Sequence, residues 1–74
     1  MPELLTIGTI NTLVQNVGYA LPARRVLART TAAIETSQDN STYAAVTTTN
    51  NQAELSAAFI RTTAATAIVT LKAM

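Results

Sequence analysis

The sequence predicts an all-β domain of six or seven short strands that fold into a small β-sandwich or barrel. Asn, Asp, Gly and Pro recur along the chain at intervals of about ten residues, a spacing typical of short strands joined by turns. Thr is abundant between these breaks, and it favours strands over helices because its branched Cβ restricts the side chain. A jelly-roll or immunoglobulin-like arrangement would pack such strands into two sheets.

Length and composition indicate one domain over residues 1–74 whose core needs outside support. A chain this short buries a smaller share of its surface than a larger domain does. It has no Cys and no His, so disulfides and the commonest metal ligand are excluded, and oligomerisation is the support that remains. Charged residues make up 12% of the chain, against about 25–35% on a typical solvated surface. We therefore expect a homo-oligomer.

The first 18 residues are expected to form an N-terminal strand or an arm that engages neighbouring subunits. Residues 4–10 are rich in β-branched side chains and predict a strand. Asn11 and Thr12 predict a turn, after which residues 13–17 extend the strand. Gly18 then ends the segment with a turn or a bulge.

Two structures compete for residues 23–30. Pro22 at the first position of a helix, followed by Ala, is compatible with a helix. Val26 and the Thr pair at its end favour a strand, which we prefer. In that strand the side chains alternate, with Val26 and Ala28 on one face and Arg25, Leu27 and Arg29 on the other.

Residues 33–48 predict a β-hairpin around which the rest of the chain is organised. Asp39 and Asn40 form turns readily and tolerate left-handed backbone angles, and β-branched and aromatic residues flank them. We expect a tight turn there that fixes the register of both strands, so Asp39→Pro should destabilise the fold.

The remaining residues predict a further turn and two or three strands. Asn50 and Asn51 mark the turn. Residues 52–56 form either a strand or one helical turn, because Thr49 and Gln52 have capping-box spacing.

Two strands are expected after that segment. In residues 58–62, Ile60 faces away from Phe59 and Arg61. Residues 67–73 form the clearest strand of the chain. Its two faces carry Val69 and Leu71 on one side, and Ile68, Thr70 and Lys72 on the other.

No combination of residues supports enzymatic chemistry, and we expect no catalytic residues, no cofactor and no metal. Without His, a nucleophile lacks its usual base. Glu35 and Asp39 flank one turn and could form a carboxylate pair. The simpler interpretation is that Asp39 caps the turn and Glu35 faces water. Asn40 and Ser41 could add oxygen ligands for calcium, but the carboxylates are too few for strong binding. A net charge of +1 argues against bulk binding to nucleic acid, and no run of residues is long and apolar enough for a membrane span.

The candidate interface residues are basic or aromatic. Arg24, Arg25 and Arg29 form the basic cluster of the sequence. Such a cluster could protect an edge strand from aggregation, contact Glu35 or Glu54 of a neighbouring subunit, or contact nucleic acid beside a stacking tyrosine. The full candidate interface comprises Arg24, Arg25, Arg29, Tyr19, Phe59 and Arg61.

Several stretches resemble known β-proteins. In residues 34–46, Ser37-Gln38-Asp39-Asn40 precedes Tyr43 and a second strand, which resembles a hairpin of small jelly-roll and carbohydrate-module sandwiches. Residues 19–26, that hairpin, and residues 58–61 leading into 68–72 together resemble short all-β proteins encoded among the structural genes of tailed bacteriophages.

This resemblance implies a structural protein of the virion. The expected function is capsid decoration, in which a cement protein stabilises the head lattice from the capsid surface. The implied partners are the major capsid protein and copies of this chain, with synthesis in the host cytoplasm and no signal peptide. No small-molecule substrate is expected, and the family supplies no catalytic residue. The alternative is a glycan- or host-surface-binding module of a phage tail or fibre.

Overall fold

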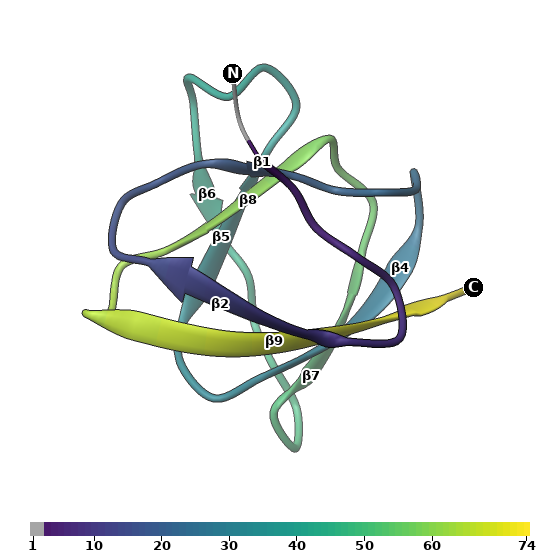
Figure 1. Ribbon diagram of the computed structural model, residues 1–74. Coiled ribbons are helices and arrows are strands. Elements are labelled where there is room, and N and C mark those ends of the chain that lie inside the picture. Colours follow the sequence, from purple (N-terminus) through teal and green to yellow (C-terminus); the bar gives the residue numbers. More distant parts are fainter. Residues whose placement is uncertain (1–2) are drawn as a thin grey trace.

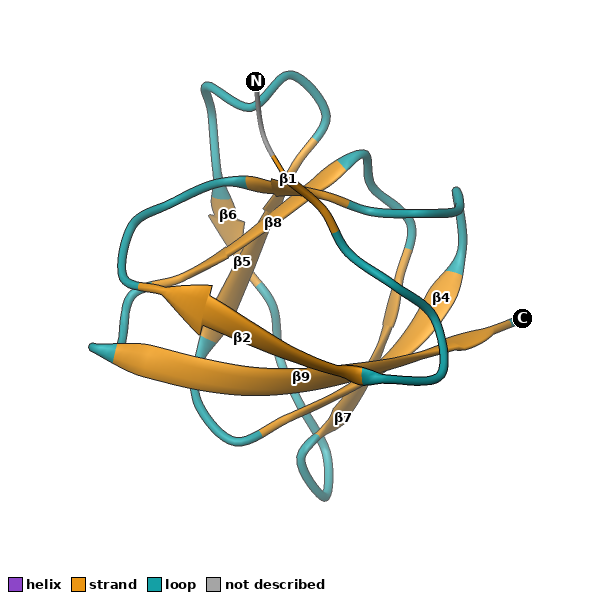
Figure 2. Cartoon of the chain, viewed as in Figure 1, coloured by secondary structure: helices purple, strands orange, loops and turns teal. Residues whose placement is uncertain are grey.

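Two β-sheets that enclose one core make up residues 3–74, the part of the chain that the computed structural model describes. Figure 1 shows β2 and β9 side by side, with β5, β6 and β8 of the other sheet behind them. The described residues form strands and loops without a helix (Figure 2), so the predicted all-β class is confirmed. The strands are β1 (Glu3–Leu4), β2 (Ile10–Val14), β3 (Tyr19–Ala20), β4 (Val26–Thr30), β5 (Ile34–Ser37), β6 (Ala44–Ala45), β7 (Gln52–Leu55), β8 (Phe59–Thr62) and β9 (Thr66–Ala73).

The strand order is β1-β3-β8-β5-β6 in the five-stranded sheet and β2-β9-β4-β7 in the four-stranded sheet. Neighbouring strands pair antiparallel, except that β1 and β3 run parallel. Residues 3–74 thus contain nine strands, where six or seven were predicted. The excess comes from β1 and β3, whose two residues each are too few to show an alternating pattern. The predicted hairpin is present, since β5 and β6 pair antiparallel.

The core lies between the sheets and is built by strict alternation along the longer strands. In β9, Ala67, Val69 and Leu71 are buried while the residues between them are exposed, as predicted. In β4, Val26 and Ala28 are buried, so the strand prediction for this segment and its parity are both confirmed. The buried apolar residues are Leu5, Leu13, Tyr19, Leu21, Val26, Ala28, Ile34, Leu55, Ala57, Ile60, Ala67, Val69 and Leu71.

The predicted turn at Asn50–Asn51 is a tight two-residue turn, whereas the predicted β5–β6 hairpin closes through a longer loop, residues 38–43, and not through a tight turn at Asp39–Asn40. Asn50 and Asn51 have φ angles of 53° and 62°, the left-handed pair that a two-residue hairpin turn requires. Thr49 and Gln52 on either side exchange backbone hydrogen bonds of 2.9 and 3.0 Å. The turn leads directly into β7, so the helical alternative for residues 52–56 is wrong.

The N-terminal prediction is also wrong in its boundaries. Residues 4–10 do not form one strand, because the chain leaves β1 after Leu4 and turns at Gly8, where φ is 84°. Asn11, predicted in a turn, lies inside β2. Its side chain is almost fully buried and bonds to the backbone of Thr6, Thr9 and Val69. Asn11 can therefore occupy a core position, because its polar atoms are all hydrogen-bonded. From the sequence alone, an Asn at this point predicts a turn.

Candidate docking surface on the four-stranded sheet

The outer face of the four-stranded sheet is divided into an apolar half and a charged half. Along each strand, side chains that do not point into the core point to this face. The apolar half lies over β2 and most of β9. The charged half lies over β4, β7 and the C-terminal end of β9.

The apolar half is the surface that we call the β2–β9 face. Its large apolar residues are Ile10, which is 72% exposed, Val14 at 53% and Ile68 at 44%. The register places Ile10 opposite Thr70, Thr12 opposite Ile68 and Val14 opposite Thr66. The six residues of the face carry no charge, and all are β-branched. An exposed apolar surface of this kind marks an interaction site more often than a solvated surface. The β2–β9 face consists of Ile10, Thr12, Val14, Thr66, Ile68 and Thr70.

The charged half continues the same sheet face. Arg29 lies opposite Thr70 on one side and Gln52 on the other, and Leu27 lies between Lys72 and Glu54. Arg25 and Glu54 form an ion pair at 3.9 Å, with side chains 66% and 64% exposed. A pair this exposed adds little to stability, so this half is available for contacts outside the chain.

The structure does not bring the six predicted interface residues together. Arg25 and Arg29 do share the outer face of the four-stranded sheet, as their parity predicts. Arg24 lies in the loop before β4. Tyr19 is buried in the core, where its hydroxyl oxygen accepts a hydrogen bond of 3.0 Å from the Val14 N–H. Tyr19 therefore links β3 of one sheet to β2 of the other, and its ring is not placed to stack on a ligand.

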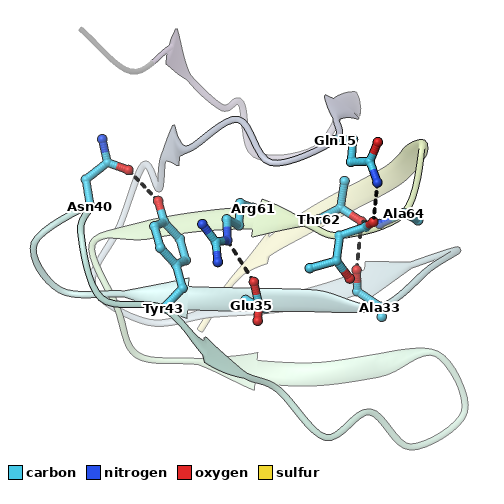
Figure 3. A network of polar contacts seen from close by, with 9 residues as sticks. Gln15, Ala33, Glu35, Asn40, Tyr43, Arg61, Thr62 and Ala64 are labelled. Carbon is cyan, nitrogen blue, oxygen red and sulfur yellow. Dashed lines mark hydrogen bonds and ion pairs between the residues drawn. The ribbon is translucent and has the colours of Figure 1, made fainter.

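Phe59 and Arg61 lie on β8 in the other sheet, where Arg61 is held by its own chain. Its Nε donates to Glu35 Oε1 at 2.7 Å, and its guanidinium carbon lies 4.2 Å from the centre of the Tyr43 ring (Figure 3). Burial raises the pKa of the Tyr43 hydroxyl, although the Arg61 charge opposes that shift. These contacts tie the Arg61 side chain to β5 and to Tyr43 of its own chain, so Arg61 braces this sheet.

The other end of this sheet is braced by hydrogen bonds to the backbone. Thr62 is fully buried, and its hydroxyl donates to the Ala33 carbonyl at 2.7 Å and accepts from the Ala64 N–H at 3.2 Å (Figure 3). Gln15 reaches over from the segment after β2 and donates from Nε2 to the Thr63 carbonyl at 2.8 Å. The polar groups in this region are therefore used for stability.

The loop from Gln38 to Tyr43 is organised by Asp39. Its Oδ1 accepts hydrogen bonds from the N–H groups of Ser41 at 2.9 Å and Thr42 at 3.0 Å. The Ser37 hydroxyl donates to the same oxygen at 2.9 Å. The Asp39 N–H in turn donates to Ser37 Oγ, a bond that Asp39→Pro would remove. With this oxygen already in use by the loop, turn capping accounts for Asp39.

The same loop packs closely on Gly18. The Tyr43 hydroxyl donates a short hydrogen bond to Asn40 Oδ1 (Figure 3). A Cβ atom on residue 18 would collide with both Asn40 and Tyr43. Gly18 is therefore required for this close approach, and its φ is not in the left-handed region.

We expect the stability contributed by the Asp39 charge to depend on pH. The N–H groups of Thr42 and Ser41 and the Ser37 hydroxyl hold the pKa of Asp39 below its ordinary value of 3.8. As the pH falls, the Asp39 carboxylate is therefore protonated at a higher pH in the unfolded chain than in the folded one. The contribution is complete above the unfolded pKa and is lost as the pH falls through the lower folded pKa. Asp39→Asn should lower Tm at neutral pH, and the gap to the wild type should close as the pH falls below 3.8 and through the lower folded pKa. Thermal unfolding of both proteins across this range measures the gap, and a gap independent of pH would contradict the assignment.

Sequence reasoning did not single out Ile10, Val14 and Ile68 as exposed apolar residues. A signal was present in β9, since the predicted alternation already placed Ile68 on the face opposite Val69 and Leu71. An apolar residue on the polar side of an otherwise regular strand indicates a second buried face. For Ile10 and Val14 the wrong boundaries of the first strand hid the same signal.

No protein-family model, no curated protein and no solved structure matches the chain. Residues 3–74 contain no group of three or more acidic residues that could hold a metal ion. No helix in this part of the chain could cross a membrane.

Proposed function

We propose that this chain is a structural protein of an assembled particle and that it docks through the β2–β9 face. The observation that carries the proposal is the exposure of Ile10, Val14 and Ile68 together on a face without charge. A sheet face in contact with water normally carries polar side chains at these positions. Covering this face with another protein surface would remove apolar area from water and stabilise the complex.

The resemblance to phage structural proteins supports a more specific form of this proposal. The chain acts as a capsid decoration protein, without enzymatic activity, on the surface of a phage head. Its partners are the major capsid protein and copies of itself, and each modest contact is multiplied because it recurs over the shell. The proposal includes a jelly-roll or immunoglobulin-like sandwich, which the two packed sheets support.

The alternative, a glycan-binding module of a tail or fibre, has less support. Sugar-binding surfaces commonly present aromatic rings in a hollow. Tyr43 is half-buried and lies against Arg61. Three surface hollows among the described residues are lined without an aromatic side chain. A glycan-array screen tests this alternative directly.

Replacing Ile68 by Lys is expected to abolish docking while the fold persists. The change places a charge at the centre of the β2–β9 face. A docked partner would bury this charge away from water without pairing it, which is unfavourable. Ile68 is 44% exposed, so the isolated domain should change in stability by less than about 1 kcal/mol. Sedimentation velocity of the chain and its co-sedimentation with phage heads should show affinity lower by about tenfold or more.

Thr47→Lys is the matched control, because Thr47 is exposed outside the β2–β9 face. It adds the same charge and should leave docking unchanged. If the wild-type chain is a monomer that binds no heads, the proposed function is wrong. If both Lys variants dock equally well, the function stands and the assigned face is wrong.

A further inference from the structure

A hollow on the charged half of the four-stranded sheet brings two cations together. It has a volume of about 380 Å³ and is lined by side chains from three strands. Arg29 and Lys72 are diagonal neighbours across β4 and β9, since Arg29 pairs with Thr70 and Lys72 pairs with Leu27. Diagonal neighbours in a sheet lie about 7–8 Å apart, and their Cβ atoms are somewhat closer. The Arg29 and Lys72 side chains can therefore both reach a ligand bound over Leu27. The lining residues are Leu27, Arg29, Gln52, Thr70 and Lys72.

The donors around this hollow have no partner within residues 3–74. The ion pairs in this part of the chain join Arg25 to Glu54 and Arg61 to Glu35, and neither involves Arg29 or Lys72. The hydrogen bonds that side chains make there also leave out these two cations and the side chains of Gln52 and Thr70. Two cations that are unpaired among the described residues therefore line one hollow together with an amide and a hydroxyl. Glu54 lies beside it, opposite Leu27, and is paired with Arg25.

We propose that this hollow is a binding site for an oxyanion, a carboxylate or a phosphate group. Arg29 presents a planar fork that holds two oxygens of such a group, and Lys72 adds a second positive charge. Gln52 Nε2 and the Thr70 hydroxyl can donate to the remaining lone pairs. The apolar Leu27 side chain between the two cations reduces water around the anion and strengthens the attraction. The bound anion relieves the repulsion between Arg29 and Lys72.

Amide chemical shifts of the full chain, titrated separately with inorganic phosphate and with acetate at constant ionic strength, test the site. We expect saturable shifts at the residues that line the hollow. The tighter-binding probe identifies the natural group as phosphate or carboxylate. Sodium chloride alone should give no saturation. In Arg29→Gln the affinity for the preferred anion should fall by about tenfold or more.

Arg24→Gln is the matched control, because it removes the same charge from an exposed residue outside this hollow. It should bind both anions as the wild type does. Equal losses in the two variants, or shifts spread evenly over all basic residues, would overturn the site in favour of general charge attraction. The site does not depend on the proposed function, because the titration uses the unassembled chain. Anion binding without docking would reject the function alone, and docking without anion binding would reject the site alone.

Discussion

Ile60→Ala is expected to remove a large part of the stability of the domain. Ile60 is fully buried on β8, the central strand of the five-stranded sheet, where it lies between Tyr19 and Thr36. Truncating a buried Ile to Ala costs about 2–5 kcal/mol, because contacts are lost and a cavity remains. The whole domain should have a free energy of unfolding of about 4–11 kcal/mol for its length. The variant should therefore be partly unfolded near physiological temperature.

Ile68→Ala is the matched control for this prediction. The same atoms are removed from an isoleucine on β9 that is 44% exposed, so the change should be below about 1 kcal/mol. Urea denaturation followed by circular dichroism gives both values in the unassembled state. Similar losses in the two variants would mean that Ile60 is not at the centre of the core.

Asn11→Asp is expected to be at least as damaging, although it replaces one side chain by another of the same shape. Asn11 Nδ2 donates to the carbonyls of Thr6 at 2.9 Å, Val69 at 3.2 Å and Thr9 at 3.3 Å. An aspartate would place a negative oxygen against these three acceptors and bury an uncompensated charge. Substitutions that leave such a charge cost about 3–5 kcal/mol. Urea denaturation at neutral pH measures the loss.

The control for this variant is Asn51→Asp. Asn51 is exposed in the tight turn with φ at 62°, a conformation that Asp also tolerates. Its stability should change by less than about 0.5 kcal/mol. The loss in Asn11→Asp should shrink at acid pH, because protonation restores one donor and removes the charge. A loss that does not change with pH would contradict the role assigned to the Asn11 amide.

The elements that sequence reasoning placed correctly are those with a long period of alternation. In β9 and β4, buried and more exposed side chains alternate over five residues or more, and the predicted faces match them. Turns were predicted at both Asp39–Asn40 and Asn50–Asn51, which carry the same local signal, but only the second is a two-residue turn. The choice between them depends on strands that are distant in the sequence. The Asp39 segment has a longer loop, because Asp39 caps it and Gly18 lets it pack on the chain.

The candidate site was less accessible to prediction than the fold. The basic cluster is adjacent in sequence, yet the loop before β4 separates Arg24 from Arg29, and Arg25 is paired with Glu54. Lys72, the neighbour that makes Arg29 significant, comes from a strand whose pairing with β4 no local pattern encodes. Fold class follows from local periodicity, whereas a surface site on a sheet depends on register between distant strands.

The pairing of β2 with β9 has a consequence for how the protein is made. Asn11 and Val69, which this pairing brings into contact, are 58 residues apart in the chain. Contacts of such long range form late, because the loop between them must close first. During synthesis β2 therefore waits for Thr66 and the residues after it to leave the ribosome. A chain that stops before β9 cannot form the β2–β9 face, so under the proposed function shortened products would be unable to dock.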